Sequence, residues 1–567
     1  MRFPIMSVVC FSLAIGSLFG QQEAALAPDQ IFYNGKIATV DSSNSIQEAF
    51  AVKGDRFLAV GSNAAMQARK GPQTRLVDLR GHTVIPGLQD NHIHPYGYVT
   101  ANLRGVDLTG VRSLAEVSDR IRQAAEKAKP GQTIYATGRW SEAALAEKRG
   151  PSRQELDSLV PDRPVLVLQR GGNAYLNTAA LNAARIDRET KTLRGEAGSV
   201  PKDAQGEPTG VIVDSGAILI SRLVPVEDIR ELTLKTFQEL NARGFTSIRE
   251  PNLPPEIMHL YWDIWREGKL TLRVAMGREL GPGEADDVEQ IVRPLGVAAS
   301  FGNEWLRYDS LGEFSVDGGW RDQFTSTVGT AEGRTVSVTA NISADKFRQA
   351  VMTMNRLGWR PAPHVNADDA LDLVLDGYEA ADREKSIRDM RWVVEHAVMI
   401  RPDQIDRFAR LGVVISAQFQ PYRGGADLMQ NMARYIGKRR VERMVPMREM
   451  LDRGLIVTAG SDWGAGTTNN PFVPFYFNVT RKTDEGMEIG AEQRITRTEA
   501  LRVSTINNAY LTYEEKIKGS IESGKLADFL ILSQDLLTVP EEDIRSTQPL
   551  ATYVGGQKVF SKDSGGF

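Results

Sequence analysis

The stretch Val84 to His94, which reads VIPGLQDNHIH, places two histidines directly after an apolar run that ends in Pro86-Gly87-Leu88. His92 and His94 stand two residues apart, so on an extended strand both rings project to the same side. Two imidazoles on one side of a strand end can bind a single divalent ion. The segment therefore predicts a strand that carries part of a metal site.

Short β-type runs alternate with long helical patterns on both sides of this segment. The strand candidates lie at 83–88, 133–137, 164–169, 245–249, 272–276, 305–314, 360–365, 391–395, 413–417 and 455–459. The helical candidates include 113–128, 226–242, 344–357 and 441–453. This alternation predicts a parallel α/β fold, and a TIM-like (β/α)8 barrel over residues 83–514 fits the length. There are more than eight strand candidates, and the pattern does not say which are peripheral.

The two ends of the chain share a different sequence pattern, in which short apolar runs alternate with turn residues. Between residues 30 and 79, short apolar runs are separated by turn pairs such as Asn34-Gly35, which are hairpin signals. Similar runs return at 526–532 and 551–560. We therefore expect residues 29–82 and 515–567 to form one small composite β-sandwich beside the barrel.

The first 20 residues predict export. Arg2 is followed by an apolar stretch from Ile5 to Phe19 and then by polar residues from Gln21 onward, as in a secretory signal peptide. The stretch is short for a membrane span, which needs about 20 residues, although an uncleaved anchor is the alternative interpretation. We expect a periplasmic or secreted protein with no stable membrane insertion after cleavage. The cleavage site and the oligomeric state stay open.

Composition narrows the chemistry further. The only cysteine, Cys10, lies inside the predicted signal peptide, so any metal has to be held by histidine and carboxylate side chains. The net charge of −4, from 68 basic and 72 acidic residues, leaves no broad basic surface for nucleic acid. A small-molecule substrate is the expected partner.

Four of the six histidines share one topological position with an aspartate. His92, His94, His364, His396 and Asp462 each come at or just after the end of a strand candidate. Such positions converge at one mouth of a barrel, where these folds place their active sites. Nitrogen and oxygen ligands suit Zn²⁺ or a similar ion. The alternatives are that Asp462 caps a helix and that His364 is a packed core residue. We expect His82 and His259 to be surface or packing residues.

Six motifs, spread in order along the chain, resemble the amidohydrolase superfamily. They are VIPGLQDNHIH at 84–94, APHVNAD at 362–368, VEHA at 394–397, AQFQP at 417–421, TAGSDW at 458–463 and KGSIESGKLADFLIL at 518–532. More narrowly, the chain is similar to the amidohydrolase-3 branch, which includes N-substituted formamide deformylases. The resemblance implies a metal-bearing barrel with a sandwich built from both chain ends.

The resemblance also implies a ligand set. In that family the first histidine pair and the aspartate bind one metal, the two later histidines bind a second, and a carboxylated lysine often bridges them. The corresponding segment here reads EFSVDG at 313–318, so Glu313 stands where lysine is expected. Glu313 either bridges two ions or ends a strand beside a single ion. A second departure is Asn173, at a position where the family usually has a substrate-pocket histidine.

The expected activity is hydrolysis of an amide or formamide-type C–N bond, other than a peptide bond, by metal-activated water. Asp462 is the expected catalytic general base and then acid. Candidate substrate-binding residues near strand ends are Tyr96, Trp140, Asn173, Arg249, Trp320, Gln418 and Trp463. The alternatives are a non-hydrolytic metalloenzyme, such as a lyase or isomerase, and a non-catalytic binding protein with a degenerate site.

Overall fold

The computed structural model describes residues 27–562, except 104, 139, 170–172, 195–196, 214–215, 281, 318–339, 420–432, 434–435 and 465–467. The predicted signal peptide and Trp320 lie outside the described residues. None of the helices in the described part is both long and apolar enough to cross a bilayer.

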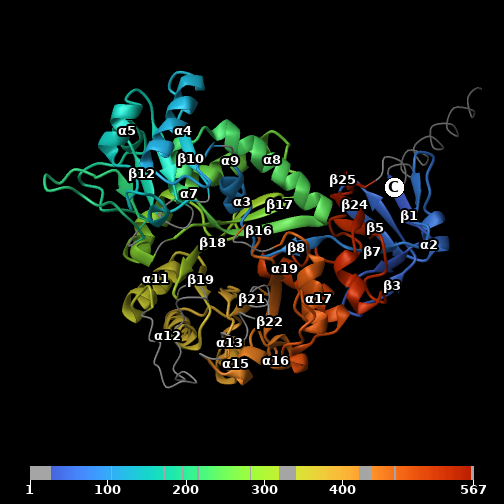
Figure 1. Cartoon of the computed structure of the whole chain (residues 1–567). Helices are drawn as coiled ribbons and strands as arrows, with labels where there is room; N and C mark the ends of the chain where they lie inside the picture. The colour runs from blue at the N-terminus through green and yellow to red at the C-terminus, as the bar shows by residue number, and fades with distance from the viewer. Residues whose placement is uncertain are drawn as a thin grey trace, which may run out of the picture.

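The centre of the molecule is an eight-stranded parallel sheet in the order β22-β21-β20-β19-β18-β17-β16-β8 (Figure 1). Its strands are β8 (Leu88–Asp90), β16 (Phe245–Leu253), β17 (Arg273–Arg278), β18 (Leu306–Ser315), β19 (Pro361–Val365), β20 (Val393–His396), β21 (Val414–Gln418) and β22 (Ile456–Gly460). The two outer strands approach each other, because the N–H of Asp462 donates to the carbonyl of His92 over 2.7 Å. The predicted TIM-like barrel is confirmed.

The structure decides which strand candidates are peripheral. The candidates at 133–137 and 164–169 form β10 (Ile134–Thr137) and β11 (Val165–Leu168) of a separate five-stranded sheet. The other strands of this side sheet are β9 (Val106–Asp107), β12 (Ala174–Leu176) and β15 (Val211–Ile212). A small hairpin, β13 (Thr192–Arg194) with β14 (Ala197–Ser199), stands apart from it.

The apolar run at 83–88 divides between two sheets. Its first part is β7 (Thr83–Pro86), which belongs to a terminal sheet, and its end begins β8 of the barrel. The division falls at Gly87, where a Cβ atom would lie 2.1 Å from Oγ1 of Thr246. A side chain at this position would clash with the side chain of Thr246, so glycine permits the close approach.

Helices cover the outside of the barrel and the side sheet. Three predicted helices are present as α4 (Leu114–Lys127), α8 (Val226–Arg243) and α11 (Ala344–Arg356). The single helix expected at 441–453 is wrong: the chain forms α15 (Lys438–Glu442) and α16 (Met447–Asp452). Pro446 lacks an N–H donor and Val445 has a φ of +49°, so a continuous helix is interrupted there. Within the described ranges, the other α-helices are α2 (Asn63–Gln67), α3 (Pro95–Asn102), α5 (Arg153–Leu159), α6 (Thr178–Ala183), α7 (Gly216–Leu223), α9 (Pro255–Arg266), α10 (Val288–Val292), α12 (Asp368–Glu384), α13 (Pro402–Leu411), α17 (Phe472–Thr480), α18 (Arg497–Val503) and α19 (Ile506–Leu511).

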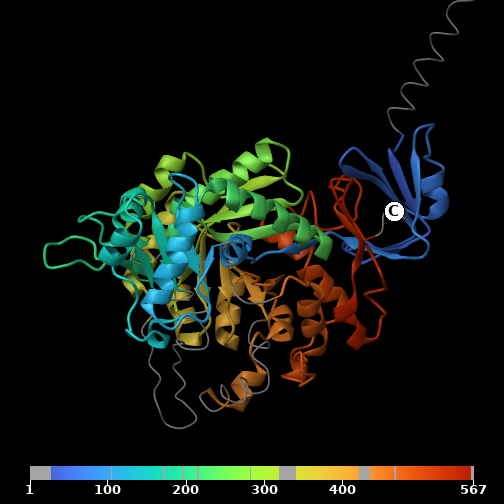
Figure 2. The same ribbon diagram turned by 45° about the horizontal axis from the view of Figure 1, so that its top comes forward.

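Strands from both ends of the chain lie together beside the barrel (Figure 2). One sheet has the order β5-β4-β1-β6 and the other β25-β24-β23-β7-β2-β3. The strands are β1 (Gln30–Tyr33), β2 (Lys36–Ala38), β3 (Ile46–Gln47), β4 (Ala49–Lys53), β5 (Arg56–Gly61), β6 (Arg75–Asp78), β23 (Phe529–Leu532), β24 (Pro549–Val554) and β25 (Gln557–Ser561). Phe32 of the first sheet stacks on Phe50 and meets Phe529 of the second edge-on, with ring centroids 4.8 and 5.0 Å apart. The two sheets therefore share an aromatic core.

A buried ion pair ties this terminal region to the barrel. Arg273 of β17 donates from Nε and Nη2 to the two carboxylate oxygens of Asp528, over 2.7 and 2.9 Å. Both side chains are buried, so the pairing offsets the cost of taking two charges out of water.

Candidate metal centre

The structure brings all six predicted metal ligands together at the C-terminal ends of the barrel strands. They are His92 and His94 after β8, Glu313 in β18, His364 in β19, His396 at the end of β20 and Asp462 after β22. Strand β8 ends at Asp90, and His94 stands directly before α3, so the first pair lies beyond the strand rather than on it. Its two rings still converge, with their Nε2 atoms 3.2 Å apart.

Three ligand atoms have the spacing of a metal site, and one carboxylate oxygen of Glu313 lies beside two of them. Asp462 Oδ1 lies 3.1 Å from Nε2 of His94 and 3.5 Å from Nε2 of His92. Glu313 Oε2 lies 3.4 Å from Nε2 of His92 and 3.6 Å from Nε2 of His94. Ligands bound about 2.0–2.1 Å from a tetrahedral zinc ion stand about 3.3–3.4 Å from one another. We name these four residues the first ligand group, and the spacing within His92, His94 and Asp462 fits one such cation.

The other ligand atoms are packed more tightly. Glu313 Oε1 lies 2.6 Å from Nδ1 of His364 and 2.9 Å from Nε2 of His396, and those two nitrogens are 2.8 Å apart. These separations are typical of hydrogen bonds. We name this set the second ligand group. Glu313 belongs to both groups, since each of its oxygens faces a different pair of histidines.

Charges in the centre stabilise one another despite burial. Burial opposes protonation of His92, but Glu313 and Glu395 outweigh it and hold the pKa of that imidazole well above its usual value. Burial likewise opposes ionisation of Asp462, but hydrogen bonds from His92 and His94 hold the pKa of its carboxyl below the usual range. A metal cation that replaces the imidazole protons would be stabilised by the same carboxylates.

Two residues of the centre have an unusual backbone conformation. The φ angles of Asp462 and His396 are +55° and +70°, in the left-handed region that residues other than glycine rarely adopt. Hydrogen bonds hold both turns: the N–H of His396 donates to Oε1 of Gln418 over 3.1 Å, and that of Asp462 donates to the carbonyl of His92. Non-glycine residues held in this way are concentrated at functional sites.

Several supporting residues were not singled out from the sequence. Glu395 accepts from Nδ1 of His92 over 2.6 Å, and Asp90 accepts the N–H groups of His92 and Ser461 over 3.1 and 3.0 Å. Burial raises the pKa of Asp90 to about 6. Their position in the sequence could have indicated this role, because Glu395 and Asp90 stand within two residues of a predicted ligand in the VEHA and VIPGLQDNHIH motifs.

The predicted substrate residues separate by location. Arg249 is fully buried, and its guanidinium donates to Asp309, to Glu395 and to the Asn91 carbonyl. Gln418 is also buried, donating from Nε2 to Ser416 while it holds the N–H of His396. We assign both to the support of the ligands rather than to a substrate surface.

The other described substrate candidates are held by neighbouring groups. Tyr96 is buried with its hydroxyl bonded to Ser221, Trp140 donates to the Leu168 carbonyl in the core of the side sheet, Asn173 donates to Glu142, and the Trp463 ring packs on Tyr98 with centroids 4.2 Å apart. The carbonyl of Trp463 also accepts the N–H of His94 over 2.7 Å, so this tryptophan lies directly beside the first ligand group. His82 and His259 take no part in the centre: His82 contacts the Leu532 carbonyl, and His259 lies on α9.

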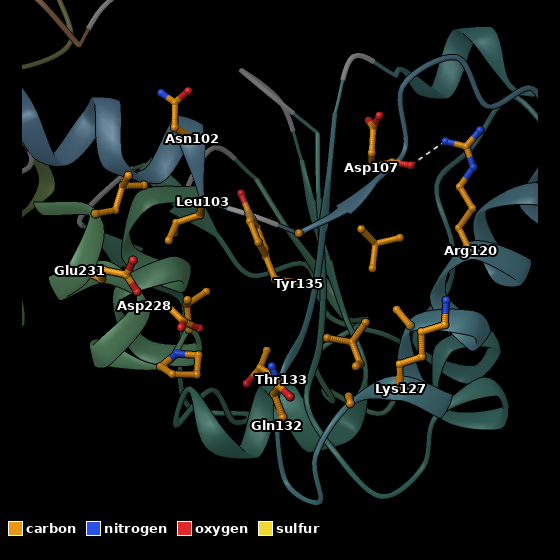
Figure 3. Close-up of a pocket in the computed structure, with 18 of the residues that line it drawn as sticks. Asn102, Leu103, Asp107, Arg120, Lys127, Gln132, Thr133, Tyr135, Asp228 and Glu231 are labelled. Atoms are coloured by element: carbon orange, nitrogen blue, oxygen red, sulfur yellow. Dashed lines mark hydrogen bonds between the residues drawn. The ribbon is translucent and has the colours of Figure 1, made fainter. Parts of the chain in front are cut away.

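A separate cleft of about 990 Å³ lies between the side sheet and α8. Figure 3 shows Asp228 and Glu231 on one side of it and Arg120 and Lys127 of α4 on the other. No predicted metal ligand is among its described lining residues. It is a feature distinct from the barrel mouth.

Comparison with known proteins agrees with this geometry. A sequence model of the amidohydrolase family matches residues 75–560. The chain belongs to the amidohydrolase family. The N-substituted formamide deformylase of Arthrobacter pascens is 28% identical to this amidohydrolase over 546 residues, which cover 93% of this chain and 97% of the relative. Protein LONG AFTER FAR-RED 3 of Arabidopsis thaliana is 28% identical over 556 residues, which cover 95% of this chain and 92% of the relative.

A solved structure shares the fold of this amidohydrolase. The metal-dependent hydrolase of Pyrococcus furiosus, an uncharacterized protein, aligns with a TM-score of 0.65 and 23% identity over 90% of this chain and 100% of its own. The family match thus makes this chain a hydrolase of the amidohydrolase family, and the Pyrococcus furiosus structure shows that the two chains share their fold.

Proposed function

We propose that this amidohydrolase is an exported enzyme that uses one or two zinc ions to hydrolyse an amide or formamide-type bond in a small molecule. The observation that carries the proposal is the triad of His92, His94 and Asp462 in the first ligand group, whose ligand atoms are 3.1–3.5 Å apart, a spacing close to that of ligands on one zinc ion. The substrate class follows the printed name of the Arthrobacter relative, a deformylase of N-substituted formamides. Export is proposed on the sequence of residues 1–20 alone.

The residues of the first ligand group suit a hydrolytic role. Bound zinc supplies a Lewis acid that polarises a carbonyl and lowers the pKa of water toward neutrality. Asp462 is ionised and its Oδ1 lies beside Nε2 of both His92 and His94, so we assign it the role of accepting a proton from the attacking water. The same carboxyl then returns the proton to the departing amine, which leaves an amine and a carboxylic acid. No cysteine is available in the described part of the chain to act instead.

Glu313 is the proposed bridge between the two ligand groups. Its two oxygens face the first and the second group separately, which is the arrangement that a bridging carboxylate needs. Because the second group is spaced for hydrogen bonds, it has to widen before it holds an ion. The structure therefore supports one ready site and a second site that forms on binding.

The test combines metal analysis with product analysis. The chain is purified without chelators, its zinc content per chain is determined, and N-substituted formamides and simple amides are supplied as substrates in ¹⁸O-labelled water. We expect at least one zinc per chain and one ¹⁸O atom in the acid product. Product formed without ¹⁸O would instead indicate a lyase or isomerase, and a chain without metal and without turnover would contradict the proposal.

A further inference from the structure

A buried row of alternating charges runs through the barrel beneath His92. Arg360 pairs with Asp309, Asp309 accepts from Nε of Arg249 over 2.5 Å, and Nη1 of Arg249 donates to Oε1 of Glu395 over 2.7 Å. All four side chains are at most 1% exposed. Two cations and two anions balance, so every charge in the row has an opposite neighbour.

The two oxygens of Glu395 have different partners. Oε1 accepts from Arg249, and Oε2 lies 2.6 Å from Nδ1 of His92. An ionised carboxylate can only accept hydrogen bonds, so the proton between Glu395 and the ring belongs to Nδ1. When the ring gives up one proton to bind zinc, the lone pair is then left on Nε2, the atom that faces His94 and Glu313 in the first ligand group.

We propose that Glu395 is a positioning residue that selects the Nδ1–H tautomer of His92. Arg249 holds one of the two terminal side-chain atoms of residue 395 and thereby determines which atom faces the imidazole ring. The inference rests on the proposed function, because it takes His92 as a zinc ligand. Carboxylates that orient a metal-bound histidine in this way change metal affinity by about 10–100-fold when they are lost. Arg249 adds a constraint, because the terminal atom of residue 395 that it contacts has to accept a hydrogen bond.

The constraint makes an unusual outcome expected for Glu395→Gln. A glutamine has one oxygen and one amide NH₂ group. Arg249 only donates, so it holds the glutamine oxygen and leaves the NH₂ group against Nδ1 of His92. Nδ1 must then accept, the ring proton moves to Nε2, and the lone pair needed by zinc is lost. The isosteric variant thus favours the opposite tautomer of His92, rather than only reducing the preference for the Nδ1–H form.

Removing Arg249 releases the glutamine. In the double variant Arg249→Met with Glu395→Gln, the amide is free to turn its oxygen toward Nδ1 and restore the competent tautomer. Asp309 keeps its pairing with Arg360 in this variant, so no carboxylate in the row is left without a cation. The Arg249→Met change should therefore restore the zinc affinity that Glu395→Gln loses. If the two changes were independent structural defects, their losses of zinc affinity would add.

The experiment measures zinc affinity of the full chain after chelator dialysis, by competition with a chromophoric chelator. We expect Glu395→Gln to bind zinc about 100-fold more weakly than wild type, and the double variant to return to within about 10-fold of wild type. Glu514→Gln is the matched control, because Glu514 is a buried carboxylate paired with Lys518 away from the centre. It should bind zinc as the wild type does.

The possible results separate the inference from its premise. Wild-type affinity in Glu395→Gln, or a double variant as weak as the single one, would overturn the tautomer selection. A wild-type chain that binds no zinc would overturn the proposed function and this inference with it. Melting temperatures of the metal-free variants show whether each one folds.

A measurement on the wild-type chain keeps the inference testable if Glu395→Gln does not fold. With ¹⁵N-labelled histidine, and with His92→Asn to assign the signal, the ring N–H of His92 is followed during zinc addition. A proton on Nδ1 stays in place when zinc binds, whereas a proton on Nε2 is displaced. Persistence of the signal supports the inference, and its loss contradicts it.

Discussion

Oε1 of Glu313 lies 2.6 Å from Nδ1 of His364, whereas its Oε2 lies 3.4 Å from Nε2 of His92. The shorter separation fits a hydrogen bond, and the longer one fits two ligands of the same cation. One carboxylate therefore joins a group that is spaced for metal to a group that is closed by hydrogen bonds. The two groups should differ in how readily they take up an ion.

Zinc should bind in two distinguishable steps. We expect titration of the metal-free chain to show one tight site and a second site weaker by about 10-fold or more, since the second ligand group has to open and lose its hydrogen bonds. Calorimetric titration, with metal content measured on the same samples, tests this. Two equal sites would contradict the difference in spacing.

Replacing the shared carboxylate should affect both steps. In Glu313→Ala the second site should disappear, because His364 and His396 alone retain no carboxylate from their group. The first site should weaken by about 10–100-fold but survive on His92, His94 and Asp462. Metal content of the variant is the readout. A variant that keeps the wild-type content would make Glu313 structural and the enzyme mononuclear.

Asp462→Asn should separate chemistry from metal binding. Asparagine keeps an oxygen toward His92 and His94 but cannot accept the water proton, so turnover should fall by about 10²–10⁴-fold. Much of the zinc should remain bound, because the other members of the first ligand group are unchanged. Turnover near the wild-type rate would exclude Asp462 as the general base.

Glu250 predicts a pH dependence of stability that is independent of turnover. It is buried, accepts from the Tyr96 N–H and the Tyr261 hydroxyl, and burial raises its pKa to about 7 from the usual 4.5. The folded chain therefore holds this proton more strongly than the unfolded chain does. The corresponding stability is complete below pH 4.5 and is lost as the pH rises through 7, by about 3 kcal/mol in all.

Glu250→Gln should remove that dependence. The melting temperature of the variant, relative to wild type, should be higher at about pH 8 than at about pH 5. Metal-free samples are compared, so that zinc binding does not contribute. A constant difference across this range would show that Glu250 is ionised in the folded chain.

Asp528→Asn should destabilise the chain without touching the metal centre. The change leaves the buried Arg273 without its carboxylate partner, which costs about 3–5 kcal/mol. We expect a lower melting temperature with unchanged zinc content per chain. A loss of zinc would mean that the terminal region supports the barrel mouth directly.

The sequence was sufficient to predict the barrel and to place six candidate ligands near the ends of its strands. Alternating strand and helix patterns predicted the barrel, because the two periodicities depend only on local spacing along the chain. The error at 441–453 arose because the apolar pattern continued across Pro446 while its backbone could not. The position of His92 and His94 after an apolar run was likewise readable from local order alone.

Only the tertiary structure decided how the centre is supported. The hydrogen bond from His92 to Glu395 joins residues that no local pattern connects, since barrel closure alone brings β8 and β20 to the same mouth. Arg249 looked like a pocket residue because it ends a strand candidate, yet it lies under the ligands between Asp309 and Glu395. Local sequence thus determined which groups can bind a cation, and the register of the closed barrel determined their distances and the charges that hold them.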